Sequence, residues 1–167
     1  MGEPRYLREY AGVLSARGAG RFRAEYPGGV LVGGGLVGEL ADAAKGRRTH
    51  QVEGDTEYIP VQSLMDRVWR LTQCDRPVSA RYITVGQSAD CDVTVPEYTL
   101  SARHCSFTKG RSARIADLGS LNGTKMNGVA LPPRKLVPIE SGAKLTMGRL
   151  LLQYFERDGF LARLQDL

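Results

Sequence analysis

Apolar and polar residues alternate in short runs over the second half of the chain. Residues 68–71, 82–85 and 93–95 each show the period of two that is typical of a strand with one buried face. Further strand-like runs follow at residues 104–107, 113–116, 125–126, 129–131, 144–147 and 150–155. Gly, Pro and Asn separate these runs, which recur roughly every eight to twelve residues. Short strands at this spacing predict an all-β fold, an antiparallel sandwich or barrel.

The two ends of the chain carry a helical pattern instead. Apolar residues come near i, i+3, i+4 and i+7 over residues 5–17, and residues 21–26 resume the pattern after a glycine break. Residues 159–167 place Phe160, Leu161, Leu164 and Leu167 at helical spacing. We therefore expect an N-terminal helical segment and a short C-terminal helix that packs on the sheets.

The segment between the first helices and the regular strands is less periodic. Residues 30–32 and 58–61 predict two short strands that pair as an added hairpin, with Pro60 confining the second to a sheet edge. The polar residues 45–57 predict a loop. The chain then divides into an N-terminal extension (1–60), a sandwich domain (61–157) and a C-terminal helical tail (158–167).

A glycine-rich run, Gly33-Gly-Gly-Leu-Val-Gly38, satisfies the G-x-G-x-x-G pattern of a dinucleotide-binding turn. In such turns glycines let backbone amides approach a pyrophosphate at a helix N-terminus. Only about thirty residues precede this run, too few for the doubly wound sheet that the motif serves. We interpret the run as a turn between two strands or as a mobile loop. A nucleotide-binding protein or an enzyme built on this run is a third functional hypothesis, and the sequence favours it less than the two binding functions given below.

Composition and cysteine usage narrow the class of protein. The chain has 167 residues, 42% of them hydrophobic, which is enough for one domain core and an extension. No apolar run approaches the roughly 20 residues that cross a bilayer, and the first residues lack the apolar core of a signal peptide. Cys74, Cys91 and Cys105 are widely spaced, which favours a reducing compartment and buried thiols over disulfides or zinc. We expect a cytoplasmic protein with no membrane contact, no metal and no cofactor.

Positive charge is concentrated in the second half of the chain. Residues 1–60 contain eight basic and eight acidic residues, so the net charge of +5 belongs to residues 61–167. Between residues 99 and 149 nine basic residues face only two acidic ones. This surplus indicates an anionic partner or a solvated basic surface. The absence of interleaved aromatic residues argues against nucleic acid.

Polar residues cluster where several of the predicted strands end. Gly86 precedes a polar turn, Ser101-Ala-Arg-His104 precedes a strand, Asn122-Gly-Thr124 follows one, and Asn127-Gly128 predicts a hairpin turn. This ordered set resembles the forkhead-associated (FHA) domain, a β-sandwich that binds phosphothreonine peptides. The resemblance covers roughly residues 61–157 and implies a non-catalytic binding module of the FHA type.

The resemblance also implies roles for individual residues. In the FHA family, the corresponding serine hydroxyl contacts the phosphate and the asparagine fixes the peptide main chain, so the resemblance implies these roles for Ser101 and Asn122. We expect further peptide contacts from Arg103, Gln87, Ser120 and Lys125, since a phosphate needs hydroxyl, amide and guanidinium donors. Structural support of the site is expected from Gly86, His104, Gly123 and Thr124. Ser101 and His104 also suggest a nucleophile and its base, but no third orienting group and no G-x-S-x-G elbow accompany them, so we expect no enzyme.

Two positions depart from the family pattern. The family usually has an arginine after the first glycine and a threonine before the asparagine, where this chain has Gln87 and Leu121. Loss of one hydrogen bond to a charged group costs about 1.5–3 kcal/mol, so phosphate affinity falls about ten- to a hundredfold unless Arg81, Arg103 or Lys125 compensates. We predict a phosphothreonine reader that links a Ser/Thr kinase or its substrate to a partner. The alternative is a degenerate module that binds a protein independently of phosphate.

Overall fold

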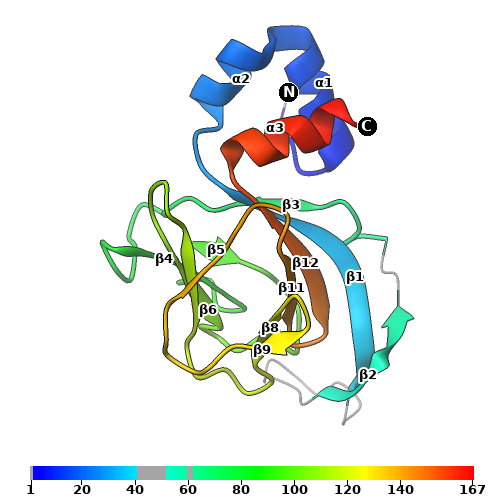
Figure 1. Cartoon of the computed structure of the whole chain (residues 1–167), viewed down its shortest axis with the longest axis vertical. Coiled ribbons are helices and arrows are strands. Elements are labelled where there is room, and N and C mark those ends of the chain that lie inside the picture. Colours follow the sequence, from blue (N-terminus) through cyan, green and yellow to red (C-terminus); the bar gives the residue numbers. More distant parts are fainter. Residues whose placement is uncertain (1, 41–51, 60–61) are drawn as a thin grey trace.

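The computed structural model describes residues 2–40, 52–59 and 62–167, in which two β-sheets lie below a small group of helices (Figure 1). The helices are α1 (Leu7–Arg17), α2 (Ala19–Glu25) and α3 (Arg157–Gln165). The strands are β1 (Val30–Leu40), β2 (Val52–Ile59), β3 (Val68–Arg70), β4 (Tyr82–Gly86), β5 (Val93–Thr94), β6 (Cys105–Thr108), β7 (Arg114–Asp117), β8 (Thr124–Met126), β9 (Val129–Ala130), β10 (Val137–Pro138), β11 (Lys144–Met147) and β12 (Leu150–Phe155).

The two sheets face each other across the main hydrophobic core. One sheet has the strand order β2-β1-β12-β11-β8-β9, with β3 also paired to β1, and the other has the order β10-β7-β6-β4-β5. The described strand pairs are antiparallel, apart from the short parallel pair of β4 and β5. The predicted antiparallel β-sandwich is confirmed, as are the helices at both ends of the chain.

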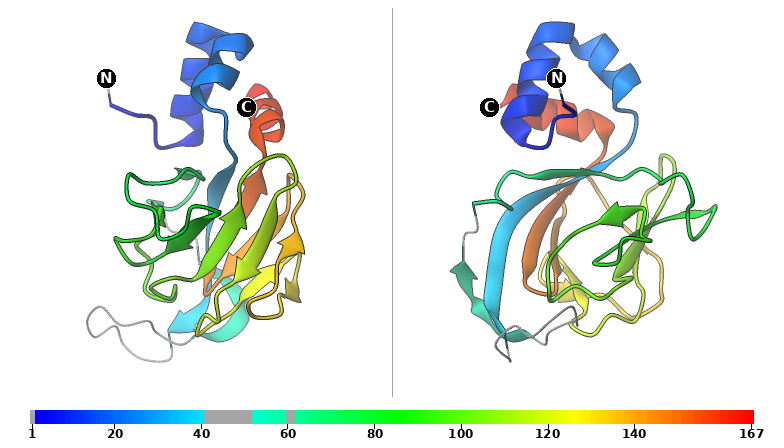
Figure 2. Two further views of the ribbon diagram at one scale, coloured as in Figure 1. Left: turned by 90° about the vertical axis from the view of Figure 1, so that its left-hand side faces the viewer. Right: turned by 180° about the vertical axis from the view of Figure 1, so that it is seen from behind.

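Strands β1 and β3 are buried on both faces. One face lies in the core between the sheets and the other packs against the helices, so these strands connect the helices to the sandwich. Leu31 and Trp69 point into the core between the sheets, whereas Val30, Val32 and Val68 alternate to the other face and pack with the helices. The helices contribute the aromatic residues Tyr10, Phe22 and Phe160 to this second core. Figures 1 and 2 show the helices and both chain ends gathered at one end of the sandwich.

Several predictions for the first sixty residues were wrong. The glycine run lies inside strand β1 and forms no turn, and Tyr58 pairs with Val37 instead of with residues 30–32. Strand β2 begins at Val52, within the predicted loop of residues 45–57, and residues 45–51 of that loop lie outside the described part of the chain. A Cβ atom at Gly33 would lie 2.0 Å from the carbonyl oxygen of Leu64. Glycine is therefore required at position 33 by the close approach of a second backbone segment, a structural reason that involves no nucleotide.

The sheet continues across the predicted division at residue 60. Strand β1 lies before that division and is paired with β12, which lies in the predicted sandwich domain. The division at residues 60 and 157 stays a prediction about how the chain is organised. In structural terms, β1 supplies part of the sheet from which the polar loops extend.

Candidate functional site

Three polar loops meet at the end of the sandwich that lies away from the helices. The register fixes this position: Thr124 at the start of β8 pairs with Met147 at the end of β11, and Met147 pairs with Leu150, the first residue of β12. Helix α3 follows the other end of β12, after Phe155. The loops of residues 87–92, 98–104 and 118–123 form this recognition end, and hydrogen bonds connect all three.

His104 joins two of these loops through its imidazole ring. Its Nδ1 atom accepts a hydrogen bond from the Ser101 backbone N–H at 3.1 Å, and its Nε2 atom lies 3.0 Å from the Gly123 carbonyl oxygen. The first contact needs an unprotonated Nδ1, so Nε2 carries the proton and donates to Gly123. Burial lowers the pKa of His104, although the Gly123 carbonyl acts in the opposite direction. The neutral ring thus acts as a brace, as the predicted supporting role requires.

The serine–histidine arrangement does not have the geometry of a nucleophile and its base. The His104 ring bonds to the backbone amide of Ser101, whereas the Ser101 hydroxyl oxygen accepts a hydrogen bond from the Leu121 backbone N–H at 3.0 Å. A serine nucleophile needs its base on the hydroxyl. Because the hydroxyl accepts from Leu121, its own proton is available to donate to a bound oxyanion.

Gly86 and Gln87 hold the first loop against the second. A Cβ atom at Gly86 would lie 2.2 Å from the Ala102 carbonyl oxygen, so only glycine fits this approach. The Gln87 backbone N–H donates to the Ser101 carbonyl at 3.0 Å. The Gln87 side chain donates to the Glu97 carbonyl at 3.1 Å, so it faces the neighbouring loop in the described structure.

Arg103 supplies positive charge beside Ser101 and is paired with an acid. Its guanidinium lies 2.7 Å from the Asp90 carboxylate, and the two side chains are 50% and 51% exposed. This hydrogen bond from Arg103 lowers the pKa of Asp90. The ion pair is solvent-exposed, so a doubly charged ligand can compete for the guanidinium with little loss of stability.

Asn122 is anchored to a buried polar network. Its side-chain amide donates to the Thr99 carbonyl at 2.9 Å. Both the backbone N–H and the hydroxyl of Thr99 donate to the buried Glu97 carboxylate, which also lies 2.6 Å from the Arg149 guanidinium. This network fixes the direction of the Asn122 side chain, which suits the predicted role of this residue in aligning a peptide backbone.

A second buried carboxylate, Asp117, organises the third loop. It accepts hydrogen bonds from the Gly119 and Ser120 backbone amides and from the hydroxyls of Ser120 and Thr124. Burial acts to raise the pKa of Asp117, but the hydrogen bonds from Ser120 and Thr124 outweigh it and hold that pKa below its ordinary value. The Ser120 hydroxyl proton is committed to this carboxylate, so the predicted contact between Ser120 and a peptide stays a prediction.

The structure therefore brings the predicted residues to one end of the molecule. Ser101 and Arg103 lie on the second loop and Ser120 and Asn122 on the third, whereas Gln87 is at the start of the first loop and Lys125 follows on β8. Sequence reasoning missed Glu97, Thr99, Asp117 and Arg149, whose roles depend on burial. One signal was present in the sequence, because Glu97 and Asp117 are acidic residues next to apolar strand residues. An unpaired charge is costly in such surroundings, so both carboxylates could be expected to have hydrogen-bond or ion-pair partners.

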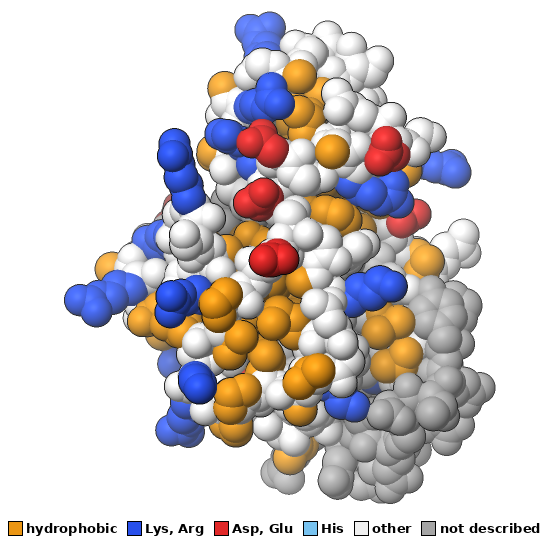
Figure 3. Space-filling view, viewed as in Figure 1, with side chains coloured by type: hydrophobic (Ala, Val, Ile, Leu, Met, Phe, Trp, Pro, Cys, Tyr) orange, Lys and Arg blue, Asp and Glu red, His pale blue; other side chains and the backbone are white. Residues whose placement is uncertain are grey.

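Charged side chains are distributed unevenly over the surface. On the face shown in Figure 3, acidic side chains lie in the upper half near the helices, and basic side chains extend down the left margin of the sandwich. Among the residues that the structure describes, no group of His, Cys, Asp and Glu could hold a metal ion, and no helix is long and apolar enough to cross a membrane.

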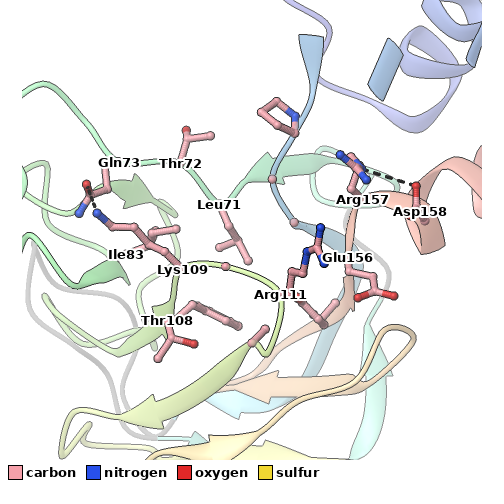
Figure 4. Close-up of a pocket in the computed structure, with 17 residues that line it drawn as sticks. Leu71, Thr72, Gln73, Ile83, Thr108, Lys109, Arg111, Glu156, Arg157 and Asp158 are labelled. Atoms are coloured by element: carbon pink, nitrogen blue, oxygen red, sulfur yellow. Dashed lines mark hydrogen bonds and ion pairs between the residues drawn. The ribbon is translucent and has the colours of Figure 1, made fainter. Parts of the chain in front are cut away.

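A cavity of about 810 Å³ lies at the helix end, away from the three loops. It is lined by the turn between β6 and β7 and by the segments that lead to α3 and β1 (Figure 4). Lys109 donates there to the Gln73 side chain and to the Ala80 carbonyl, and Arg157 faces Asp158. Strand β6 separates this cavity from Ser101, so it is not part of the recognition end.

The comparison with known families agrees with this fold. Residues 83–148 match the FHA domain family, so this part of the chain is similar to an FHA domain. An oxoglutarate dehydrogenase inhibitor from Corynebacterium diphtheriae is 32% identical over 83 residues, which cover 49% of this chain and 53% of that protein. The probable serine/threonine-protein kinase fhkA of Dictyostelium discoideum is 30% identical over 76 residues, which cover 40% of this chain and 13% of the kinase. The chain thus matches about half of one relative and a small part of the other.

Solved structures show the same fold. The FHA domain of the CT664 protein from Chlamydia trachomatis has a TM-score of 0.50 at 14% identity, over 77% of this chain and 96% of that domain. The yeast Dun1 FHA domain, solved with a doubly phosphorylated peptide derived from Rad53, has a TM-score of 0.50 at 18% identity, over 77% of this chain and 74% of that chain.

Proposed function

We propose that this chain is a non-catalytic reader of phosphothreonine in a partner protein. The observation that carries the proposal is that His104 and the Ser101 hydroxyl connect the two loops on which Ser101, Arg103 and Asn122 lie. The Ser101 hydroxyl would donate to the phosphate, the Arg103 guanidinium would neutralise its charge, and the Asn122 amide would align the peptide main chain. A phosphothreonine brings close to two negative charges and three acceptor oxygens, which suits this set of donors.

The missing arginine at Gln87 makes Arg103 central to this proposal. The Gln87 side chain is engaged with the Glu97 carbonyl, so the nearest cation to Ser101 along the chain is Arg103. A guanidinium presents a fork of donors to phosphate oxygens. Arg103 would leave Asp90 and bind the phosphate, a substitution of one anion by a more highly charged one.

The partner class follows from the ligand. A phosphothreonine is the product of a Ser/Thr kinase, so we propose a kinase or one of its substrates as the partner, in the cytoplasm. The match to the Dictyostelium kinase supports a place in kinase signalling. The module would connect a phosphorylated protein to whatever the rest of this chain binds.

A second candidate is a module of the same shape that binds a protein without phosphate. It is favoured by Leu121, which is 59% exposed where the family usually has threonine, and by the exposed Tyr98 on the neighbouring loop. Exposed apolar side chains on binding loops are typical of a protein–protein contact.

The two candidates differ in one measurement. An oriented phosphothreonine peptide library and its unphosphorylated copy would be titrated against the wild type, Ser101→Ala and the control Ser112→Ala, an exposed serine in the turn at the other end of β6. We expect phosphate-dependent binding that Ser101→Ala weakens about ten- to a hundredfold and Ser112→Ala leaves unchanged. Equal binding of both libraries to the wild type would reject phosphate recognition in favour of the second candidate.

A further inference from the structure

Arg134 is held at the recognition end by an unusual backbone conformation. It lies between β9 and β10 and has a φ of 60°, in the left-handed region that non-glycine residues rarely adopt. Its backbone N–H donates to the Asp117 carbonyl at 2.6 Å, and the preceding Pro133 forms a bridge with Asp117. Surrounding structure therefore fixes Arg134 beside the loop that follows β7.

The Arg134 guanidinium lies against Gly119. Its Nε atom is 3.3 Å, and one terminal nitrogen 3.4 Å, from the position that a Cβ atom on Gly119 would occupy. The missing side chain of Gly119 leaves room for the guanidinium. Gly119 is two residues before Leu121, whose backbone N–H bonds to the Ser101 hydroxyl oxygen. The guanidinium is thus close to the residues that we expect to hold a peptide.

Other arginines at this end are already paired with acids. Arg103 pairs with Asp90, and Arg149 pairs with the buried Glu97. Arg134 is exposed, and no carboxylate in the described part of the chain forms an ion pair with it. Although Asp117 is close in space, its carboxylate already accepts hydrogen bonds from the Gly119–Ser120 backbone and from two hydroxyls.

From this arrangement we propose that Arg134 selects phosphopeptides that carry an acidic side chain near the phosphothreonine. The inference rests on the proposed phosphothreonine recognition and adds a preference that the three loops alone do not give. An extended peptide advances about 3.3 Å per residue, so three positions on either side of the phosphothreonine reach about 10 Å, and we place the acidic residue within that range. The carboxylate would accept hydrogen bonds from the planar guanidinium on the surface of Gly119.

The experiment uses a phosphothreonine peptide library in which one position at a time is fixed as Glu or as its neutral analogue Gln. The full chain would be tested as wild type, Arg134→Asn and Arg134→Lys, with Arg111→Asn as the control, since Arg111 is an exposed arginine in the turn at the helix end. Asn is chosen because it tolerates the left-handed conformation. We expect the wild type to prefer Glu over Gln about two- to fivefold at one position within this range.

Arg134→Asn should remove this preference without weakening the binding of Gln peptides, Arg134→Lys should retain part of it, and Arg111→Asn should retain it fully. Three results would overturn the inference: no preference for Glu in the wild type, a preference unchanged in Arg134→Asn, or an equal loss of Glu and Gln peptides in that variant. Binding that does not depend on phosphate at all would remove the proposed function, and this inference with it. Phosphate-dependent binding without a Glu preference would remove only the role of Arg134.

Discussion

Replacement of His104 by alanine should show how much the imidazole ring contributes to stability by connecting the two loops. The ring is fully buried, and its removal deprives the Ser101 N–H and the Gly123 carbonyl of their partner. An unsatisfied buried group costs about 1–3 kcal/mol, and the cavity adds to this loss. We therefore expect His104→Ala to lower the free energy of unfolding by about 3–5 kcal/mol, a large share of the roughly 5–15 kcal/mol that is typical of a domain.

Urea unfolding of the full chain measures this loss, and peptide titration under folding conditions measures its effect on the site. Ser106→Ala is the matched control, because it removes a buried hydroxyl from β6, the strand that directly follows His104, without changing the loops. His104→Gln should recover part of the stability, since its amide can both donate and accept. A loss below about 1 kcal/mol in His104→Ala, with peptide affinity unchanged, would refute the reasoning that the ring supports both loops.

Three further outcomes test other contacts. Because burial lowers the pKa of His104, the unfolded chain takes up a proton at a higher pH than the folded chain, so the stability that is present above pH ~6.5 should fall as the pH is lowered towards 5. Thermal melts should show this dependence of stability on pH in the wild type and less of it in His104→Gln. Equal dependence in both proteins would contradict the prediction. Gly86→Ala should cost about 1–3 kcal/mol in urea unfolding, because its Cβ would overlap the Ala102 carbonyl, and unchanged stability would show that the loop yields. Asp90→Asn should raise phosphopeptide affinity about two- to threefold in a titration by freeing Arg103, whereas a loss of affinity would mean that Asp90 positions the arginine.

The regular strands and the outline of the site could be predicted from the sequence. Alternation between apolar and polar residues is a local property, so β4, β6, β7, β11 and β12 were predicted close to their observed bounds. The turn at Asn127-Gly128 was also predicted, and both residues have positive φ, as such hairpins require. The polar loops were found because their residues stand at the ends of these strands.

What could not be predicted depends on contacts between distant segments. The glycines of β1 suggested a turn. Glycine is required at position 33 because the Leu64 backbone packs directly against it, a contact that no local pattern reveals. Glu97 and Arg149 form an ion pair across 52 positions in the sequence, and either residue alone is consistent with a solvated surface. Strand β10 has only two residues, one of them Pro138, so it lacks any periodic signal.

Because β1 is buried on both faces, it limits how short a fragment of this chain can fold when it is transferred to another protein. A fragment trimmed to residues 83–148, where the family match lies, would lack β1, β3 and β12, and β11 would lose its neighbour on one side. Leu31, Trp69 and Leu152 would be missing from the interior, which would open to water. The shortest fragment that keeps this interior complete is thus nearly the whole chain, including the helices.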